Sequence, residues 1–145
     1  TTVQKCIRAG GKNCDLENVG SSRRHLSFFE MCGFFQLPPA LNTYKRDSIR
    51  LAMQFLTNEL QLDHRRIKVT VHESDMESLN IWARDHGKRA YVCSSEHNFW
   101  SMGTEPGLPC GPCTEIYYDF SDHSSGKSSQ VDVAPPDDEN CLEIW

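Results

Sequence analysis

Residues 3–31 contain the side chains of this chain that are best suited to hold a phosphate. Two β-prone runs, Val3–Arg8 and Ser27–Met31, flank a polar connection that carries glycine and basic residues. Arg8 ends the first run, and Lys12 follows four positions later. A guanidinium offers two parallel donors to a phosphate, and an ammonium adds a second positive charge nearby. This spacing predicts a hairpin that can cradle a polyphosphate.

The returning strand adds aromatic rings to this basic loop. Arg23, Arg24 and His25 precede Phe28 and Phe29. Because side chains alternate between the faces of a strand, one ring can face a site while the other packs inward. The segment then offers a flat surface for a base beside donors for phosphates. The residues alone equally allow a plain basic hairpin whose arginine is paired at the surface.

Composition limits the classes of function. The chain has 145 residues, 38% hydrophobic and 24% charged, which suits one soluble globular domain. Its net charge of −5 gives no general basic field for nucleic acid, so any RNA contact would need local patches such as Arg23–Arg24 or His64–Arg66. No apolar run has the length of a membrane span. The chain starts at Thr1 without methionine and ends on the apolar run Leu142–Trp145, so we expect a piece of a longer protein.

The cysteines indicate a reduced protein. There are seven, an odd number, and the expected strands and helices provide a core without disulfides. Cys110 and Cys113 form a C-x-x-C pair, which is half a zinc site or a redox pair. No second pair accompanies it, so no metal is assigned, although a small zinc-binding interaction module stays open as an alternative of a different class.

Helical periodicity is clearest over residues 47–60. Asp47 is a suitable N-cap, and the apolar residues that follow at helical spacing are Ile49, Ala52, Met53, Leu56 and Leu60. A second helix is expected between a cap at Ser74 or Asp75 and a stop at Gly87, with Leu79, Trp82 and Ala83 inward.

Strand patterns occupy much of the remainder. Residues 67–72 alternate apolar and polar and predict a half-buried strand; further strands are expected at 90–93, 115–120 and from 141 onward. Residues 94–113 read as a Gly- and Pro-rich loop, and 121–140 as a surface loop. Few helices among several strands predict an α+β fold with a mainly antiparallel sheet flanked by helices. Neither the Rossmann nor the P-loop glycine pattern occurs.

The opening segment resembles the second signature motif of the class II aminoacyl-tRNA synthetases. That motif has an arginine on one strand, a variable loop, and a histidine four residues before a phenylalanine on the partner strand; here these are Arg8, His25 and Phe29. The wording is similar to the alanyl family in particular, in the blocks QKCIRAGGK, DLENVG, FFEM, HNFWSMG (97–103), PCGPCTEIYYD (109–119) and LEIW (142–145). These blocks follow the family's order along almost the whole chain.

The resemblance implies a partial class II synthetase-like catalytic core, with residues 1–145 as part of a single aminoacylation domain truncated at both ends. It implies an alanine–tRNA ligase that uses ATP and Mg²⁺ and that contacts tRNA(Ala) through regions largely outside this chain, in the cytoplasm or alternatively the mitochondrion. Arg8 is the implied catalytic residue on the α-phosphate, and Trp100 walls the alanine pocket. The implied ATP-binding positions are Arg8, Lys12, Leu26, Phe29, Trp100, Ile144 and Trp145.

The chain departs from the family pattern in several places. Leu26 replaces a histidine that contacts ATP in the family. Cys14 lies in the run Lys12–Asp15, which differs from the run of basic and polar residues that the family has there. Residues 33–44 diverge from the family sequence, and Thr104-Glu105 stand where the family has an aspartate. The resemblance places the family's first and third motifs outside this chain, so the isolated 145 residues are expected to be inactive. The alternative to a ligase is a divergent, non-catalytic synthetase-like fragment that binds a nucleotide or a partner.

Overall fold

The chain forms two units, Thr1–Tyr44 and Lys45–Trp145. The structure is a computed structural model that describes residues 2–9, 16–21, 25–33, 43–121, 134–135 and 139–145. The strands and helices are β1 Thr2–Ile7, β2 Phe28–Gly33, α1 Tyr44–Gln54, β3 Ile67–His72, α2 Met76–His86, β4 Tyr91–Cys93, β5 Phe99–Ser101, β6 Cys110–Pro112, β7 Thr114–Asp119 and β8 Cys141–Glu143.

The first unit contains an antiparallel pair of strands. β1 and β2 pair from Thr2 with Gly33 to Ile7 with Phe28, which confirms both predicted strands within two residues at each end. The Arg8 backbone N–H donates to the Ser27 carbonyl at 2.8 Å and continues this ladder. Most of residues 33–44, where the chain diverges from the family pattern, lie outside the described residues.

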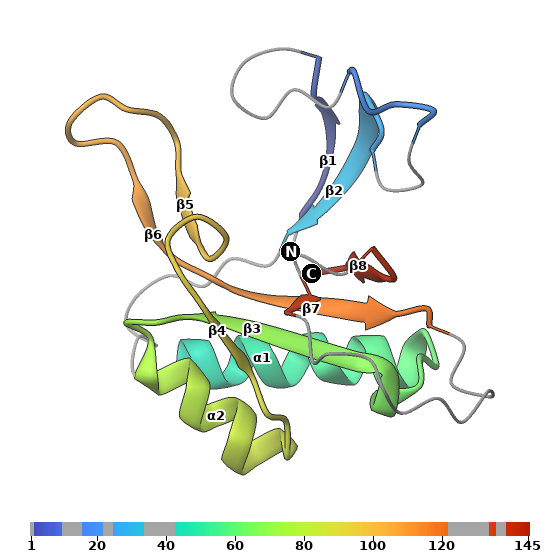
Figure 1. Ribbon diagram of the computed structural model, residues 1–145, viewed down its shortest axis with the longest axis vertical. Coiled ribbons are helices and arrows are strands. Elements are labelled where there is room, and N and C mark those ends of the chain that lie inside the picture. The colour runs from blue at the N-terminus through green and yellow to red at the C-terminus, as the bar shows by residue number, and fades with distance from the viewer. Residues whose placement is uncertain (1, 10–15, 22–24, 34–42, 122–133, 136–138) are drawn as a thin grey trace. The chain divides into compact units, whose positions relative to one another are not determined.

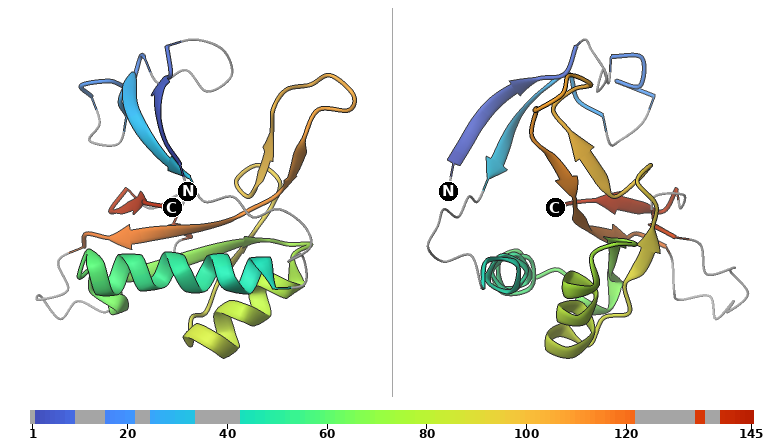
Figure 2. Two further views of the ribbon diagram at one scale, coloured as in Figure 1. Left: turned by 180° about the vertical axis from the view of Figure 1, so that it is seen from behind. Right: turned by 90° about the vertical axis from the view of Figure 1, so that its left-hand side faces the viewer.

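The second unit contains a four-stranded sheet of order β4-β3-β7-β8. β3 pairs with β4 in parallel, whereas β3–β7 and β7–β8 are antiparallel. The helices α1 and α2 lie on one side of this sheet, and the β5–β6 hairpin extends from the other side (Figures 1 and 2). The predicted α+β class with a mainly antiparallel sheet and flanking helices is confirmed. None of the helices in the described part of the chain is both long and apolar enough to cross a membrane.

Helix α1 confirms the strongest periodic signal, with two corrections. It begins at Tyr44, so Asp47 lies in the first turn and is not the N-cap. The helix continues into a π-helical turn at Phe55–Glu59, where the Leu60 N–H donates to the Phe55 carbonyl. This wider winding shifts Leu60 off the apolar stripe, and its side chain is 51% exposed instead of inward. The buried residues of the stripe are Ile49, Ala52, Met53 and Leu56.

Strand β3 is buried on both faces, which corrects the half-buried prediction. Val69 and Val71 pack into the core beneath the helices, and Ile67 joins them. On the opposite face Thr70 is 0% and His72 7% exposed. The cause is the central position of β3 together with residues of the 94–99 segment that bond to this face. We call this second side the polar face; its residues are Lys68, Thr70 and His72 of β3 and Glu115, Tyr117 and Asp119 of β7.

Helix α2 begins and ends at the predicted residues. The Asp75 carboxylate accepts from the Ser78 backbone N–H at 3.1 Å and from its hydroxyl at 2.7 Å, so Asp75 is the N-cap. Gly87 ends the helix with φ of 62°, a left-handed conformation that glycine adopts without strain. The buried residues are Ser78, Ile81 and Trp82, and Leu79 packs against the core as predicted; Ala83, expected inward, is exposed.

Residues 94–113 were expected to be a loop, but they contain the β5–β6 hairpin. Trp100 pairs with Gly111, between the Phe99–Pro112 and Ser101–Cys110 pairs. Strands of three residues leave too short a pattern for alternation to be recognised. Predicted strands at 90–93 and 115–120 correspond to β4 and β7, and the last one ends as β8 at Glu143. The predicted surface loop at 121–140 lies largely outside the described residues and stays a prediction.

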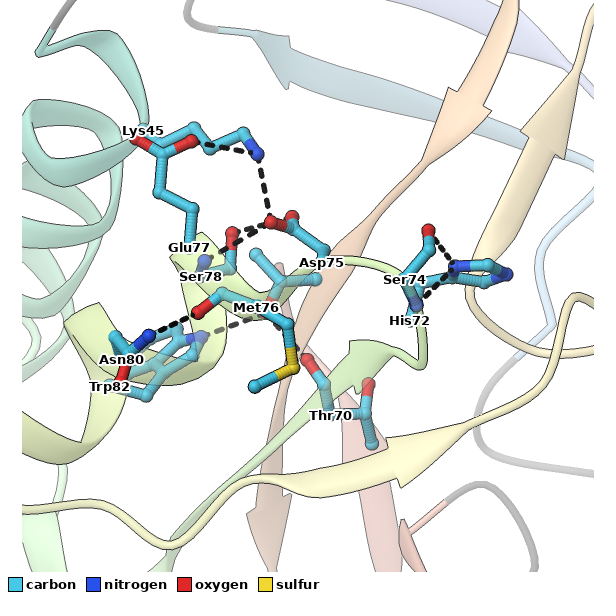
Figure 3. A network of polar contacts seen from close by, with 11 residues as sticks. Lys45, Thr70, His72, Ser74, Asp75, Met76, Glu77, Ser78, Asn80 and Trp82 are labelled. Atoms are coloured by element: carbon cyan, nitrogen blue, oxygen red, sulfur yellow. Dashed lines mark hydrogen bonds and ion pairs between the residues drawn. The ribbon is translucent and has the colours of Figure 1, made fainter.

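An ion-pair network joins the starts of the two helices (Figure 3). Lys45 Nζ lies 2.8 Å from Asp75 Oδ1 and 3.1 Å from Glu77 Oε2. Burial alone would raise the pKa of Asp75, but hydrogen bonds from Lys45 and Ser78 outweigh it and hold that pKa below its ordinary value. Asp75 therefore both caps α2 and binds the side-chain amine of Lys45, which lies in the first turn of α1.

Replacement of Asp75 by alanine should destabilise the protein. The loss of the cap should cost about 1 kcal/mol of unfolding free energy, and the unpaired Lys45 adds to it. Asp75→Asn keeps a capping side chain but not the charge, so its loss should be smaller. Urea denaturation at pH 7 measures both, with Glu77→Gln as control because the Glu77 side chain is 60% exposed. Equal effects of Asp75→Ala and Glu77→Gln would contradict the assignment.

The Asp75 contribution should also depend on pH. Its folded pKa lies below its unfolded value, so the carboxylate stabilises the fold above about pH 4, and this contribution is lost as the pH falls through the folded value. The difference in unfolding free energy between the wild type and Asp75→Asn should therefore shrink as the pH is lowered from 7 towards 3. A difference that stays constant over this range would overturn the prediction.

Candidate functional site

Arg8 and Phe29 lie on the same face of the β1–β2 hairpin. Phe29 is the register partner of Cys6, and Arg8 lies two residues beyond Cys6, so all three side chains project to one side. The Arg8 guanidinium carbon is 5.3 Å from the centroid of the Phe29 ring, which is cation–π geometry. The ring thus restrains a planar group whose donors match a phosphate.

The other side of this hairpin carries apolar side chains. Phe28 pairs with Ile7, and the two side chains are 57% and 74% exposed. Phe28 and Phe29 therefore face opposite sides, as the strand alternation predicted. Leu26 precedes β2 and is 58% exposed, so its apolar side chain offers no polar group at this position. Lys12, Arg23 and Arg24 lie outside the described residues, and their roles stay predictions.

Trp100 lies at the middle of the β5–β6 hairpin. It pairs with Gly111, and a Cβ on that glycine would lie 3.8 Å from the indole Nε1, so the indole extends across the glycine. The ring is 47% exposed. A tight turn closes the hairpin, because Gly107 has φ of 89° after Pro106 and the Leu108 N–H donates to the Glu105 carbonyl. The hairpin therefore presents an aromatic wall.

Ile144 and Trp145 extend the β7–β8 pairing. The Ile144 N–H donates to the Ile116 carbonyl at 2.8 Å, and the Ile116 N–H donates to the Trp145 carbonyl at 2.8 Å. The Ile144 side chain packs against the core. The Trp145 and Phe55 rings pack edge to face, with their centroids 6.1 Å apart.

The predicted ATP-binding residues fall into both units. Arg8 and Phe29 are brought together in the first unit, whereas Trp100, Ile144 and Trp145 belong to the second. A single nucleotide site made of both sets stays a prediction.

Sequence reasoning did not identify the polar network on the second unit's sheet. Asn98, Cys113, Glu115 and Tyr117 meet on the polar face beside Thr70. The alternation of Glu115, Tyr117 and Asp119 along β7 was a usable signal for that strand, since all three share one face. Asn98 had no such signal, because it precedes a strand of three residues.

Glu115 accepts hydrogen bonds from two weak acids of this network. The Tyr117 hydroxyl donates to Oε2 at 2.7 Å, and the Cys113 thiol donates to Oε1 at 3.4 Å. Burial, and then the charge of Glu115, raises the pKa of Cys113 to about 12. Burial and the bond to Glu115 also raise the pKa of Tyr117 well above its ordinary value. Both groups keep their protons at neutral pH, so neither is poised as a nucleophile.

His72 is hydrogen-bonded as a structural histidine. The Ser74 backbone N–H donates to Nδ1 at 3.1 Å, so Nδ1 is an acceptor and the ring N–H is on Nε2 (Figure 3). Nε2 lies 2.9 Å from Ser95 Oγ and donates to it. A serine hydroxyl that accepts a hydrogen bond from the histidine ring is not activated for attack. His72 is therefore an internal histidine whose two ring nitrogens both have hydrogen-bond partners.

The two cysteines of the C-x-x-C pair differ in environment. Cys110 lies on β6 and is exposed, whereas Cys113 is partly buried against Glu115. Among the residues that the structure describes, no group of three or more His, Cys, Asp or Glu side chains is placed to hold a metal ion.

Comparison with known proteins gives matches along the whole chain. Residues 1–145 match the family described as class II (A) tRNA synthetases. The chain is 45% identical over 149 residues to the alanine–tRNA ligase of Hydrogenovibrio crunogenus and 42% identical over 153 residues to that of Pseudoalteromonas translucida. The alanine–tRNA ligase of Shewanella loihica is 43% identical over 155 residues. Each alignment covers 100% of this chain but only 16% to 17% of the relative.

Alkylation should distinguish the two cysteines of the pair. With a pKa of about 12, Cys113 is almost entirely protonated at pH 8, and its thiol is partly buried. Iodoacetamide should therefore modify exposed Cys110 at least about tenfold faster than Cys113, since the thiolate is the nucleophile. Peptide mass spectrometry after timed quenching measures both rates in one sample. Similar rates for the two cysteines would show that Glu115 and burial do not protect Cys113. In addition, Glu115→Gln alone should accelerate the alkylation of Cys113.

Proposed function

Because this chain belongs to the class II (A) tRNA synthetase family, we propose that it is part of an alanine–tRNA ligase. The observation that carries the proposal is the match of the full chain, at 42% to 45% identity, to relatives named alanine–tRNA ligase. Since the chain spans only 16% to 17% of those relatives, the reaction is proposed for the whole protein and not for this segment alone.

Arg8 and Phe29 are the residues proposed to hold ATP. The guanidinium binds the α-phosphate and stabilises the negative charge that develops there during transfer, while the ring offers a flat apolar surface to the adenine. Their shared face and 5.3 Å contact support this assignment, since the cation–π contact restrains the guanidinium before substrate arrives. Lys12 is proposed as a second phosphate ligand. Leu26, in the same segment, is proposed as a further ATP-binding position.

Trp100 is proposed to wall the alanine pocket and to lie near the nucleotide, with Ile144 and Trp145 at the same site. A half-exposed indole that extends across Gly111 gives a flat apolar surface against which a methyl group can pack. A pocket of this kind discriminates by size, because a larger side chain would meet the ring.

The proposed chemistry needs no protein nucleophile. The carboxylate oxygen of alanine attacks the α-phosphorus of ATP, the bond to the β-phosphate oxygen breaks, and pyrophosphate leaves with that electron pair. The 3′-terminal ribose hydroxyl of tRNA(Ala) then attacks the alanyl carbonyl and releases AMP. Positioning and charge stabilisation provide the acceleration, which agrees with the protonated state of Cys113 and Tyr117. Mg²⁺ would neutralise phosphate charge, and no described residue of this chain is assigned to it.

The partners and location follow from the same proposal. Alanine, ATP and tRNA(Ala) are the substrates, with tRNA contacts made largely by other parts of the protein. The cytoplasm is the proposed compartment, and the mitochondrion is the alternative. A non-catalytic relative that binds nucleotide is the competing function, and the apolar exposed Leu26 is the observation that favours it.

Substitution of Arg8 should abolish most adenylate formation in the full-length protein. Arg8→Ala removes the proposed phosphate donors and should reduce alanine-dependent ATP–pyrophosphate exchange by about 100-fold or more. Arg50→Ala is the matched control, because the Arg50 guanidinium binds Gln54 and Asp47 of its own helix, and it should leave exchange within about twofold. Equal activities of the two variants would remove Arg8 from the site. An inactive wild type would favour the non-catalytic alternative.

The isolated 145 residues should not catalyse this exchange. The segment that is matched covers only 16% to 17% of the relatives, so groups on the remaining chain are expected to complete the ATP site. The test compares the isolated chain with the full-length protein at equal concentration, with alanine and ATP at saturating levels. Exchange by the isolated chain at a rate near that of the full-length protein would refute the prediction.

A further inference from the structure

Asn98 joins three segments of the second unit from a fully buried position. Its side chain is 0% exposed although it lies outside any strand. Nδ2 donates to Thr70 Oγ1 on β3 at 2.8 Å and to the Cys113 carbonyl, between β6 and β7, at 3.3 Å. The Cys113 backbone N–H donates in return to the Asn98 carbonyl at 2.9 Å. One side chain therefore ties the central strand to both ends of the β5–β6 hairpin.

The orientation of the Asn98 amide is determined by these partners. A backbone carbonyl can only accept, so the nitrogen and not the oxygen must face Cys113. Asn98 Oδ1 is then left buried without a hydrogen-bond partner among the described residues. A buried unpaired acceptor costs free energy, and it persists where the rest of the structure requires the group. The stabilising contribution of the Asn98 side chain therefore comes from the two bonds that its nitrogen makes.

At the base of the hairpin, β6 continues through Cys113 into β7 of the sheet. β5 and β6 share three register pairs, and the pair nearest the sheet, Phe99 with Pro112, directly adjoins Asn98 and Cys113. The Phe99 ring meets the His72 ring at 5.7 Å, which is the second contact at the base. Trp100 is the next residue along β5, so a rotation at the base would displace its indole.

We propose that Asn98 is a positioning residue that fixes the β5–β6 hairpin, and with it the Trp100 indole, against the central strand. The part of this inference that concerns alanine rests on the proposed function. Asn98 touches no reacting atom; it acts through Trp100, so its loss should change how alanine fits more than how ATP binds.

Three variants of the full-length protein test this proposal. Asn98→Ala removes both bonds of the amide nitrogen. Thr70→Val removes only the acceptor on β3 and keeps the volume of the buried side chain, which guards against a general failure to fold. Asn80→Ala is the matched control, because the exposed Asn80 amide donates to the Met76 carbonyl at 2.8 Å within α2 and has no link to the hairpin.

The kinetic measurement is the KM for alanine and for ATP in pyrophosphate exchange, together with the selectivity for alanine over glycine. Asn98→Ala should raise the alanine KM by about tenfold and lower the selectivity, while the ATP KM stays within about twofold. Thr70→Val should shift the same quantities in the same direction by a smaller factor. Asn80→Ala should match the wild type. Equal changes in both KM values, or none, would overturn the proposal.

A second measurement is independent of activity. Hydroxyl-radical footprinting with mass spectrometry reports the solvent exposure of Trp100 and of Trp82, which is 0% exposed in the wild type. Asn98→Ala should change the oxidation rate of Trp100 by at least about twofold and leave Trp82 protected. An unchanged Trp100 rate would refute positioning even in an active enzyme. A changed rate in a protein whose wild type lacks exchange would support positioning and refute only the proposed function.

Discussion

The second unit is organised by the burial of β3 on both faces. A strand in this position cannot leave its polar side chains to water, so each one must find a partner in another segment. Thr70 is bonded by Asn98, and His72 by serines on either side. The Thr70 carbonyl accepts a further bond, from the hydroxyl of Thr114, which itself accepts from the Trp82 indole. The same constraint therefore attaches a helix, a hairpin and a loop to one strand.

The sequence allowed the regular elements to be predicted where local chemistry decides them. The two ends of α2, at Asp75 and Gly87, could be predicted because capping and left-handed geometry are properties of single residues. Periodicity located α1, but the shift to π winding that exposes Leu60 has no local signature. Asn98 could not be identified, because its importance comes from Thr70, which is distant in sequence and adjacent only after the sheet has formed.

The candidate site shows a similar division. The motif placed Arg8 and Phe29 correctly on neighbouring strands, because antiparallel register follows from the hairpin itself. Their cation–π contact depends on side-chain packing that alternation suggests but does not fix. The Cys113 thiol and the Tyr117 hydroxyl, which both donate to Glu115, stay protonated and are not nucleophiles. This agrees with the proposed reaction, in which the protein positions and polarises the substrates.

The short pairing of β5 with β6 gives the second unit two levels of stability. The three register pairs bury little apolar surface, since Trp100 is 47% and Met102 69% exposed, so we expect opening of this hairpin to cost less free energy than opening of β3. We expect local opening to involve the segment beyond Asn98 first, because Asn98 and the β3 residues below it are buried. A ligand that packs against Trp100 would then bind the less stable of these two levels, and ordering the hairpin would offset part of the affinity that its contacts alone could provide.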